Sequence, residues 1–109
     1  MAPSASPARI IVLDGNAGFA GAANRFIERL PGHARAARDV VLVDLGLAGL
    51  DLARRIKRSN PSLAVIALAL FPTPELRAEA ERAGIDAVVS KEDFAEELPG
   101  ALVRVAAAR

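Results

Sequence analysis

Three charged residues stand directly after short apolar runs, and their types and spacing suit chemistry on a phosphoryl group. The residues are Asp14, Asp44 and Lys91, and the runs before them are 10–13, 40–43 and 87–90. If each run is a strand of a parallel sheet, these side chains meet where the carboxyl ends of the strands converge. Carboxylates can hold a divalent cation through oxygen, and an ammonium group can pair with a phosphoryl oxygen. We therefore expect a site for a cation and a phosphoryl group there.

The elements that must position these residues alternate between strands and helices. Continuous apolar runs predict strands that are buried on both faces, and these runs are 10–13, 40–43, 63–70 and 87–89. Apolar residues at helical spacing predict amphipathic helices, at about 19–30, 52–58, 74–83 and 94–105. This alternation predicts an α/β fold, a doubly wound parallel sheet with right-handed crossovers and helices on both faces.

Local signals refine the element boundaries. Thr73 followed by Pro74 is a strong helix start, since a capping hydroxyl precedes proline at the first helical position. Gly84 is a natural residue for the end of that helix. Pro99 falls inside the last apolar stripe and should kink the helix, because proline deletes one backbone donor. The Gly- and Leu-rich stretch 45–49 after Asp44 is expected to be a loop.

Composition limits the class of protein. The chain of 109 residues is one domain, with 14 Lys+Arg against 13 Asp+Glu, and this balance argues against an obligate nucleic-acid binder. Without cysteine it has no disulfide or thiolate metal site. Residues 1–8 lack the basic and apolar regions of a signal peptide and should form a flexible leader to a domain at 9–109. The longest apolar run is too short to span a membrane, so we expect a cytoplasmic protein.

The sequence resembles the receiver domain of bacterial two-component response regulators over nearly its whole length, from about Arg9 to Val105. Three stretches carry the resemblance: 40–47, 52–56 and 83–91. It implies a flavodoxin-like sheet of order 2-1-3-4-5 and a non-enzymatic signalling role, in which Asp44 accepts a phosphoryl group from a sensor histidine kinase. It also implies that Lys91 contacts the phosphate. The implied Mg²⁺ ligands are Asp14, Asp44 and the backbone carbonyl of Gly46.

The departures from the receiver pattern are as informative as the matches. Receivers have two adjacent acids after the first strand, and the second of them falls on Gly15 here. The hydroxyl and aromatic residues that report phosphorylation fall on Ala69 and Val88. Mg²⁺ depends on few protein carboxylates held in near-ideal geometry. The resemblance therefore implies weak Mg²⁺ binding and weak phosphorylation of Asp44.

Two other functions remain open from the sequence. The first is a pseudo-receiver, which has the receiver fold but serves interaction or dimerisation independently of phosphorylation. The second is a dinucleotide-binding Rossmann-like domain, because 15–21 reads G-x-x-G-x-x-G after an apolar strand. Against the second, the chain has no tyrosine, and Lys91 would have no role.

Several conspicuous residues have simpler explanations. The basic cluster of Arg54, Arg55, Lys57 and Arg58 reads as a solvated helix face, and His33 as a solvated loop residue. The phenylalanines at helical spacing, which are Phe19, Phe26 and Phe94, read as core residues.

The chain is short between its first two predicted strands. Between Asp14 and Asp44 lie 29 residues (15–43), which hold one helix and the lead-in to a strand but no second strand with a crossover helix. We therefore expect the receiver's second helix to be missing and its second strand to be vestigial, around 33–37. The uncovered first strand is an apolar edge, and this predicts a homodimer or a partner complex on that side.

Overall fold

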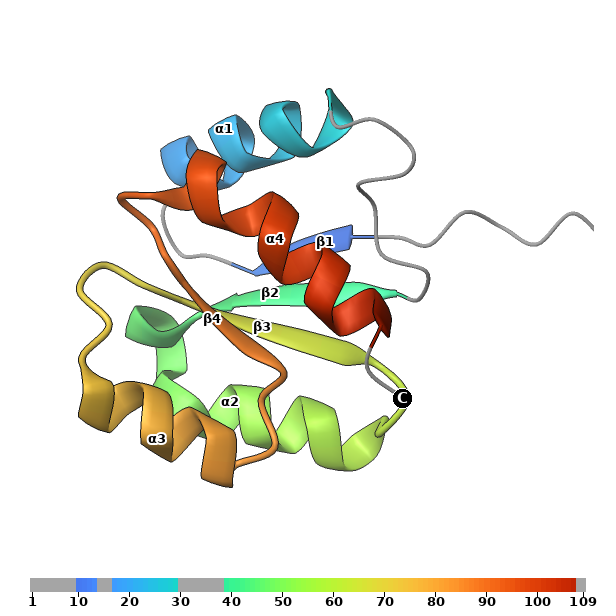
Figure 1. The fold of residues 1–109 in the computed structure, drawn as a ribbon, viewed down its shortest axis with the longest axis vertical. Coiled ribbons are helices and arrows are strands. Elements are labelled where there is room, and N and C mark those ends of the chain that lie inside the picture. The colour runs from blue at the N-terminus through green and yellow to red at the C-terminus, as the bar shows by residue number, and fades with distance from the viewer. Residues whose placement is uncertain (1–9, 14–16, 30–38, 108–109) are drawn as a thin grey trace, which may run out of the picture.

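A computed structural model describes residues 10–13, 17–29 and 39–107, and these form an alternating α/β domain (Figure 1). The predicted strands and helices are all present within this range. In chain order the elements are β1 Ile10–Leu13, α1 Ala17–Glu28, β2 Val40–Asp44, α2 Leu45–Ser59, β3 Ala64–Ala69, α3 Pro74–Arg82, β4 Ala87–Ser90 and α4 Phe94–Ala107. None of the helices in the described ranges is long and apolar enough to cross a membrane. The predicted leader and the segment 33–37 lie outside the described residues.

The four described strands form one parallel sheet in the order β1-β2-β3-β4. Among the described residues this order matches the 1-3-4-5 part of the expected 2-1-3-4-5 sheet, and the expected doubly wound topology is confirmed. In the register, Asp44 at the end of β2 lies beside Leu68 of β3, and Ser90 at the end of β4 lies beside Ala69. The register therefore brings the ends of β2 and β4 to the same edge, with only β3 between them.

Helices cover both faces of the sheet, with α1 and α4 on one side and α2 and α3 on the other (Figure 1). Alternate residues of the central strands enter opposite cores, because successive strand side chains point to opposite faces. On the α4 side the core includes Leu42, Ile66, Leu68, Leu98 and Leu102, and on the α2 side it includes Val43, Ala53, Val65, Ala67 and Ala80. Phe94 is buried as predicted.

The start of α2 differs from the sequence-based expectation. Residues 45–49 are helical rather than a loop, because Asp44 is an N-cap residue whose Oδ1 accepts a hydrogen bond from the Gly46 N–H at 3.1 Å. Gly49 then takes a left-handed φ of 59° inside the helix. Figure 1 shows the chain changing direction in this part of α2. One capped turn and a left-handed glycine thus replace the expected loop.

We expect Gly49→Ala to lower the free energy of unfolding by about 1–2 kcal/mol, because a Cβ disfavours left-handed φ. Nothing lies within 4 Å of the added Cβ, so the cost is conformational rather than steric. Gly100→Ala is the matched control, since Gly100 lies in α4 without a positive φ. It should be neutral or stabilise the protein by up to about 1 kcal/mol. Urea denaturation of both variants measures the difference, and equal effects would contradict this account of Gly49.

Lys57 corrects the expectation that the basic cluster is only a solvated face. Its Nζ donates to the Asp86 Oδ2 and to the Leu63 carbonyl, both at 2.8 Å. The same Asp86 Oδ2 accepts from the Val65 N–H at 2.8 Å. The Lys57 and Asp86 side chains are only 19% and 17% exposed. Their hydrogen bonds form a shielded network that joins the C-terminal end of α2 to the N-terminal ends of β3 and β4.

Candidate functional site

Asp44 and Lys91 meet at the carboxyl edge of the sheet. Asp44 ends β2 and Lys91 directly follows β4, where its N–H donates to the Ala69 carbonyl of β3 at 2.8 Å. The Lys91 Nζ lies 3.7 Å from the Asp44 Oδ2, and the two side chains are 11% and 15% exposed. The structure therefore brings together Asp44 and Lys91, two of the three residues that the sequence predicts to share a site.

Both carboxylate oxygens of Asp44 have a positive or hydrogen-bonding neighbour. Oδ1 accepts from the Gly46 N–H, and Oδ2 faces the Lys91 ammonium. The positive N-terminal end of α2 adds to the same favourable field, since unpaired N–H groups gather there. This arrangement suits a carboxylate, and it would also suit the larger negative charge of a phosphoryl group at the same place.

The other predicted site residues divide into two groups. Asp14 and Gly15 lie outside the described residues. Ala69 and Val88, at the positions of the receiver's reporting residues, are each only 9% exposed and pack as apolar side chains. The two positions therefore carry neither a hydroxyl nor an aromatic ring to respond to a phosphoryl group.

The described residues include only part of the implied Mg²⁺ site, because Asp14 lies outside them. They contain no cluster of three acidic, histidine or cysteine side chains that could hold a metal ion. Asp44 is the one predicted carboxylate ligand among them. Gly46 lies in the first turn of α2, and its N–H donates to the Asp44 Oδ1. The ligand role of the Gly46 carbonyl, which the resemblance implies, stays a prediction.

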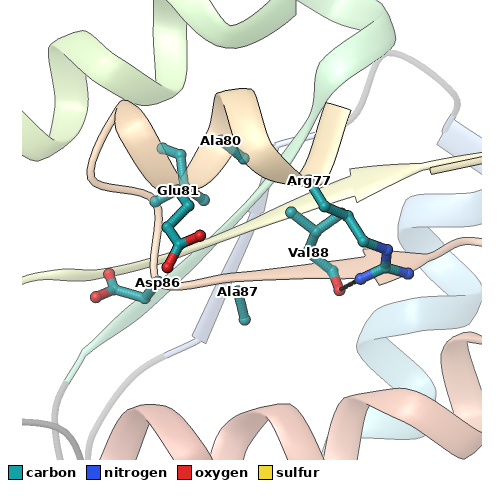
Figure 2. Close-up of a pocket in the computed structure, with 7 residues that line it drawn as sticks. Arg77, Ala80, Glu81, Asp86, Ala87 and Val88 are labelled. Atoms are coloured by element: carbon teal, nitrogen blue, oxygen red, sulfur yellow. Dashed lines mark hydrogen bonds between the residues drawn. The ribbon is translucent and has the colours of Figure 1, made fainter. Parts of the chain in front are cut away.

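Two side chains that sequence reasoning missed bind the outer edge of β4, next to the site. The Arg77 Nη1 of α3 donates to the Val88 carbonyl at 3.2 Å (Figure 2), and the Glu97 Oε1 of α4 accepts from the Ser90 N–H at 3.0 Å. These bonds satisfy backbone groups at the edge of the sheet, which hinders strand addition there. No sequence signal predicted them, because each depends on how a helix lies along β4.

Solved structures with a similar fold include response-regulator receiver domains, whereas no family model and no curated protein matches the sequence. The isolated receiver domain of RcsB from Salmonella enterica serovar Typhimurium superposes with a TM-score of 0.72 at 21% identity, covering 90% of this chain and 87% of that one. A receiver domain protein from Clostridium thermocellum gives a TM-score of 0.72 at 23% identity, covering 91% and 94%.

A longer RcsB response regulator from Salmonella typhimurium gives a TM-score of 0.74 at 21% identity. The match covers 88% of this chain but only 58% of that regulator, whose structure was studied for its interaction with DNA. The fold of the described residues is therefore that of a response-regulator receiver domain.

Proposed function

We propose that this chain is a signal-transduction receiver domain in which Asp44 accepts a phosphoryl group, slowly, from a sensor histidine kinase. The observation that carries the proposal is the Asp44–Lys91 pair at the carboxyl edge of a receiver fold. The role is signalling rather than enzymatic, in a cytoplasmic protein whose partners are other signalling proteins. The balanced charge of the chain argues against nucleic acid as a partner of this domain.

The chemistry that these residues support is transfer of a phosphoryl group between two nucleophiles. A carboxylate oxygen of Asp44 attacks phosphorus, the P–N bond of a phosphohistidine breaks, and the electron pair leaves with the imidazole. The Lys91 ammonium, already 3.7 Å from Asp44, then pairs with a phosphoryl oxygen and offsets its charge. Gly15 stands where a receiver has a second metal-binding acid, and Ala69 stands where it has a hydroxyl that bonds the phosphoryl group. We therefore expect this transfer to be slow.

A phosphorylation-independent pseudo-receiver is the second candidate, and a specific observation favours it. Asp44 already serves as the N-cap of α2, a structural role that would preserve an aspartate without any phosphorylation. The apolar side chains of Ala69 and Val88 also favour the pseudo-receiver, since neither offers a polar group that could sense a phosphate.

Phosphoramidate, whose P–N bond mimics phosphohistidine, separates the two candidates. We expect wild-type protein to gain one phosphate slowly, as measured by intact-mass spectrometry. Lys91→Ala should react at roughly one tenth of the wild-type rate or slower, because the phosphoryl oxygen loses its cation. Arg55→Ala, on the exposed side of α2, is the matched loss of a cation elsewhere and should leave the rate unchanged. No gain in the wild type would favour the pseudo-receiver, and fast stoichiometric gain would contradict a weak site.

We also propose that the chain forms a homodimer through the side of the sheet where β1 lies. Ile11 of β1 is 45% exposed, and only residues 29–39 separate α1 from β2. We expect light scattering to show dimers at high concentration and Ile11→Lys to weaken them, because a charge at the edge opposes strand pairing. Val103→Lys, another exposed apolar position, should leave them intact. A wild-type monomer at all concentrations would contradict this proposal.

A further inference from the structure

A pocket whose lining includes Ser90 and Glu92, the two chain neighbours of Lys91, combines exposed apolar side chains with acidic ones. It has a volume of about 450 Å³ and lies between the loop after β3 and the loop after β4. On one side are Leu70 and Phe71, whose side chains are 58% and 71% exposed. Phe94, in contrast, is buried in the core. An exposed aromatic residue next to a leucine at a pocket is a typical feature of a surface that binds a partner.

The charge of the pocket restricts the chemistry of that partner. Glu92, Asp93 and Glu97 line it, against the single cation of Arg77. Within the part of the chain that the structure describes, neither Glu92 nor Asp93 forms an ion pair. The Arg77 guanidinium is held by the Val88 carbonyl. The pocket is therefore acidic, and it is complementary to a positively charged group.

We propose that this pocket binds an arginine-bearing segment of a partner protein. A guanidinium can lie over the Phe71 ring in a cation–π contact while its planar N–H groups pair with the carboxylates of Glu92 or Asp93. An apolar neighbour in the same segment covers Leu70. The interaction requires no phosphate on Asp44, so it stands apart from the proposed phosphorylation and can be tested on unmodified protein.

The pocket is held in shape by contacts that do not involve its proposed binding groups. On one side the Thr73 hydroxyl caps α3 through the Leu76 N–H at 3.0 Å. On the other the Glu97 carboxylate fixes the end of β4 through the Ser90 N–H. Phe71, Glu92 and Asp93 can therefore be changed while these contacts remain. Asn at position 93 also keeps a side chain suited to the start of a helix.

The test is an NMR titration of the whole chain with a blocked leucine–arginine–leucine tripeptide. We expect millimolar binding, with amide shifts that cluster at 70–73 and 90–93. Phe71→Ser and the double variant Glu92→Gln/Asp93→Asn should each weaken it about tenfold, because each removes one half of the recognition. Val103→Ser removes an apolar group that is 57% exposed on α4 and should leave binding unchanged. Melting temperatures check that every variant is folded.

A matched leucine–glutamate–leucine tripeptide should not bind. Equal shifts with that peptide, shifts confined to other surfaces, or binding that survives both sets of substitutions would each overturn the proposal. So would concentration-dependent self-association that Phe71→Ser abolishes, because a second copy of the chain would then be the occupant. Failure of phosphorylation at Asp44 leaves the titration result unaffected, so the two proposals fail separately.

Discussion

Replacing Asp86 with alanine is expected to lower the free energy of unfolding by roughly 2–4 kcal/mol, one of the largest effects of any polar substitution in the described residues. One carboxylate oxygen accepts from both the Lys57 ammonium and the Val65 N–H. Without the Asp86 carboxylate, the shielded Lys57 ammonium and the Val65 N–H near the start of β3 each lose a hydrogen-bond partner. The hydrogen bonds that tie the Asp86 side chain to α2 and β3 would disappear together.

Urea denaturation with a matched control distinguishes this network from ordinary surface ion pairs. Asp51→Ala removes the carboxylate that lies 3.5 Å from Arg54, where the two side chains are 72% and 42% exposed. That change should cost about 0.5 kcal/mol or less. If Asp86→Ala and Asp51→Ala have the same effect, the network around Lys57 contributes no more than a surface pair and our account of it is wrong.

Restoring an acid at position 15 should tighten Mg²⁺ binding by about tenfold or more, the second large effect that we expect. Gly15 occupies the position of the receiver's second acid, so Gly15→Asp adds a hard oxygen ligand next to Asp14 in the sequence. Mg²⁺ takes few direct ligands from a protein. Even substitution of the groups that hydrogen-bond to the ligands of a metal site changes the metal affinity by ~10–100-fold. The added carboxylate also repels Asp14 when no metal is bound, so the metal-free variant should be less stable.

Calorimetric titration of Mg²⁺ into wild type and variant measures the change. Asn16→Asp adds the same charge one position further along and is the matched control, because it should raise affinity only through general electrostatic attraction. Equal affinities for Gly15→Asp and the wild type would mean that the segment after β1 does not present its side chains as a receiver does.

The strands could be predicted from the sequence because each is a continuous apolar run between clear breaks. β3, for example, was expected at 63–70 and spans Ala64–Ala69. The start of α3 was equally readable, since Thr73 caps it and Pro74 opens it. Gly84 also takes the left-handed conformation expected after a helix, with φ of 86°. The pairing of Asp44 with Lys91 followed from the fold alone, because parallel strands deliver their ends to one edge.

What the sequence did not reveal depends on three-dimensional placement. Lys57 and Asp86 are 29 residues apart, and nothing in the spacing of the basic cluster marks one of its members as shielded. The stretch 45–49 contains two glycines, which favour a loop, yet the cap provided by Asp44 and the left-handed Gly49 allow a helical turn. Arg77 and Glu97 bond to β4 only because the helices on both sides bring them to its edge.

Identifying the residue that carries phosphate tests the central claim most directly. After prolonged treatment with phosphoramidate and Mg²⁺, borohydride reduces an aspartyl phosphate to homoserine, which peptide mapping by mass spectrometry can locate. We predict homoserine at position 44 and at no other aspartate, with no modification in Asp44→Asn. Homoserine at another position such as Asp51 or Asp93, or an unmodified Asp44 after long incubation, would contradict the assignment of Asp44 as the phospho-acceptor.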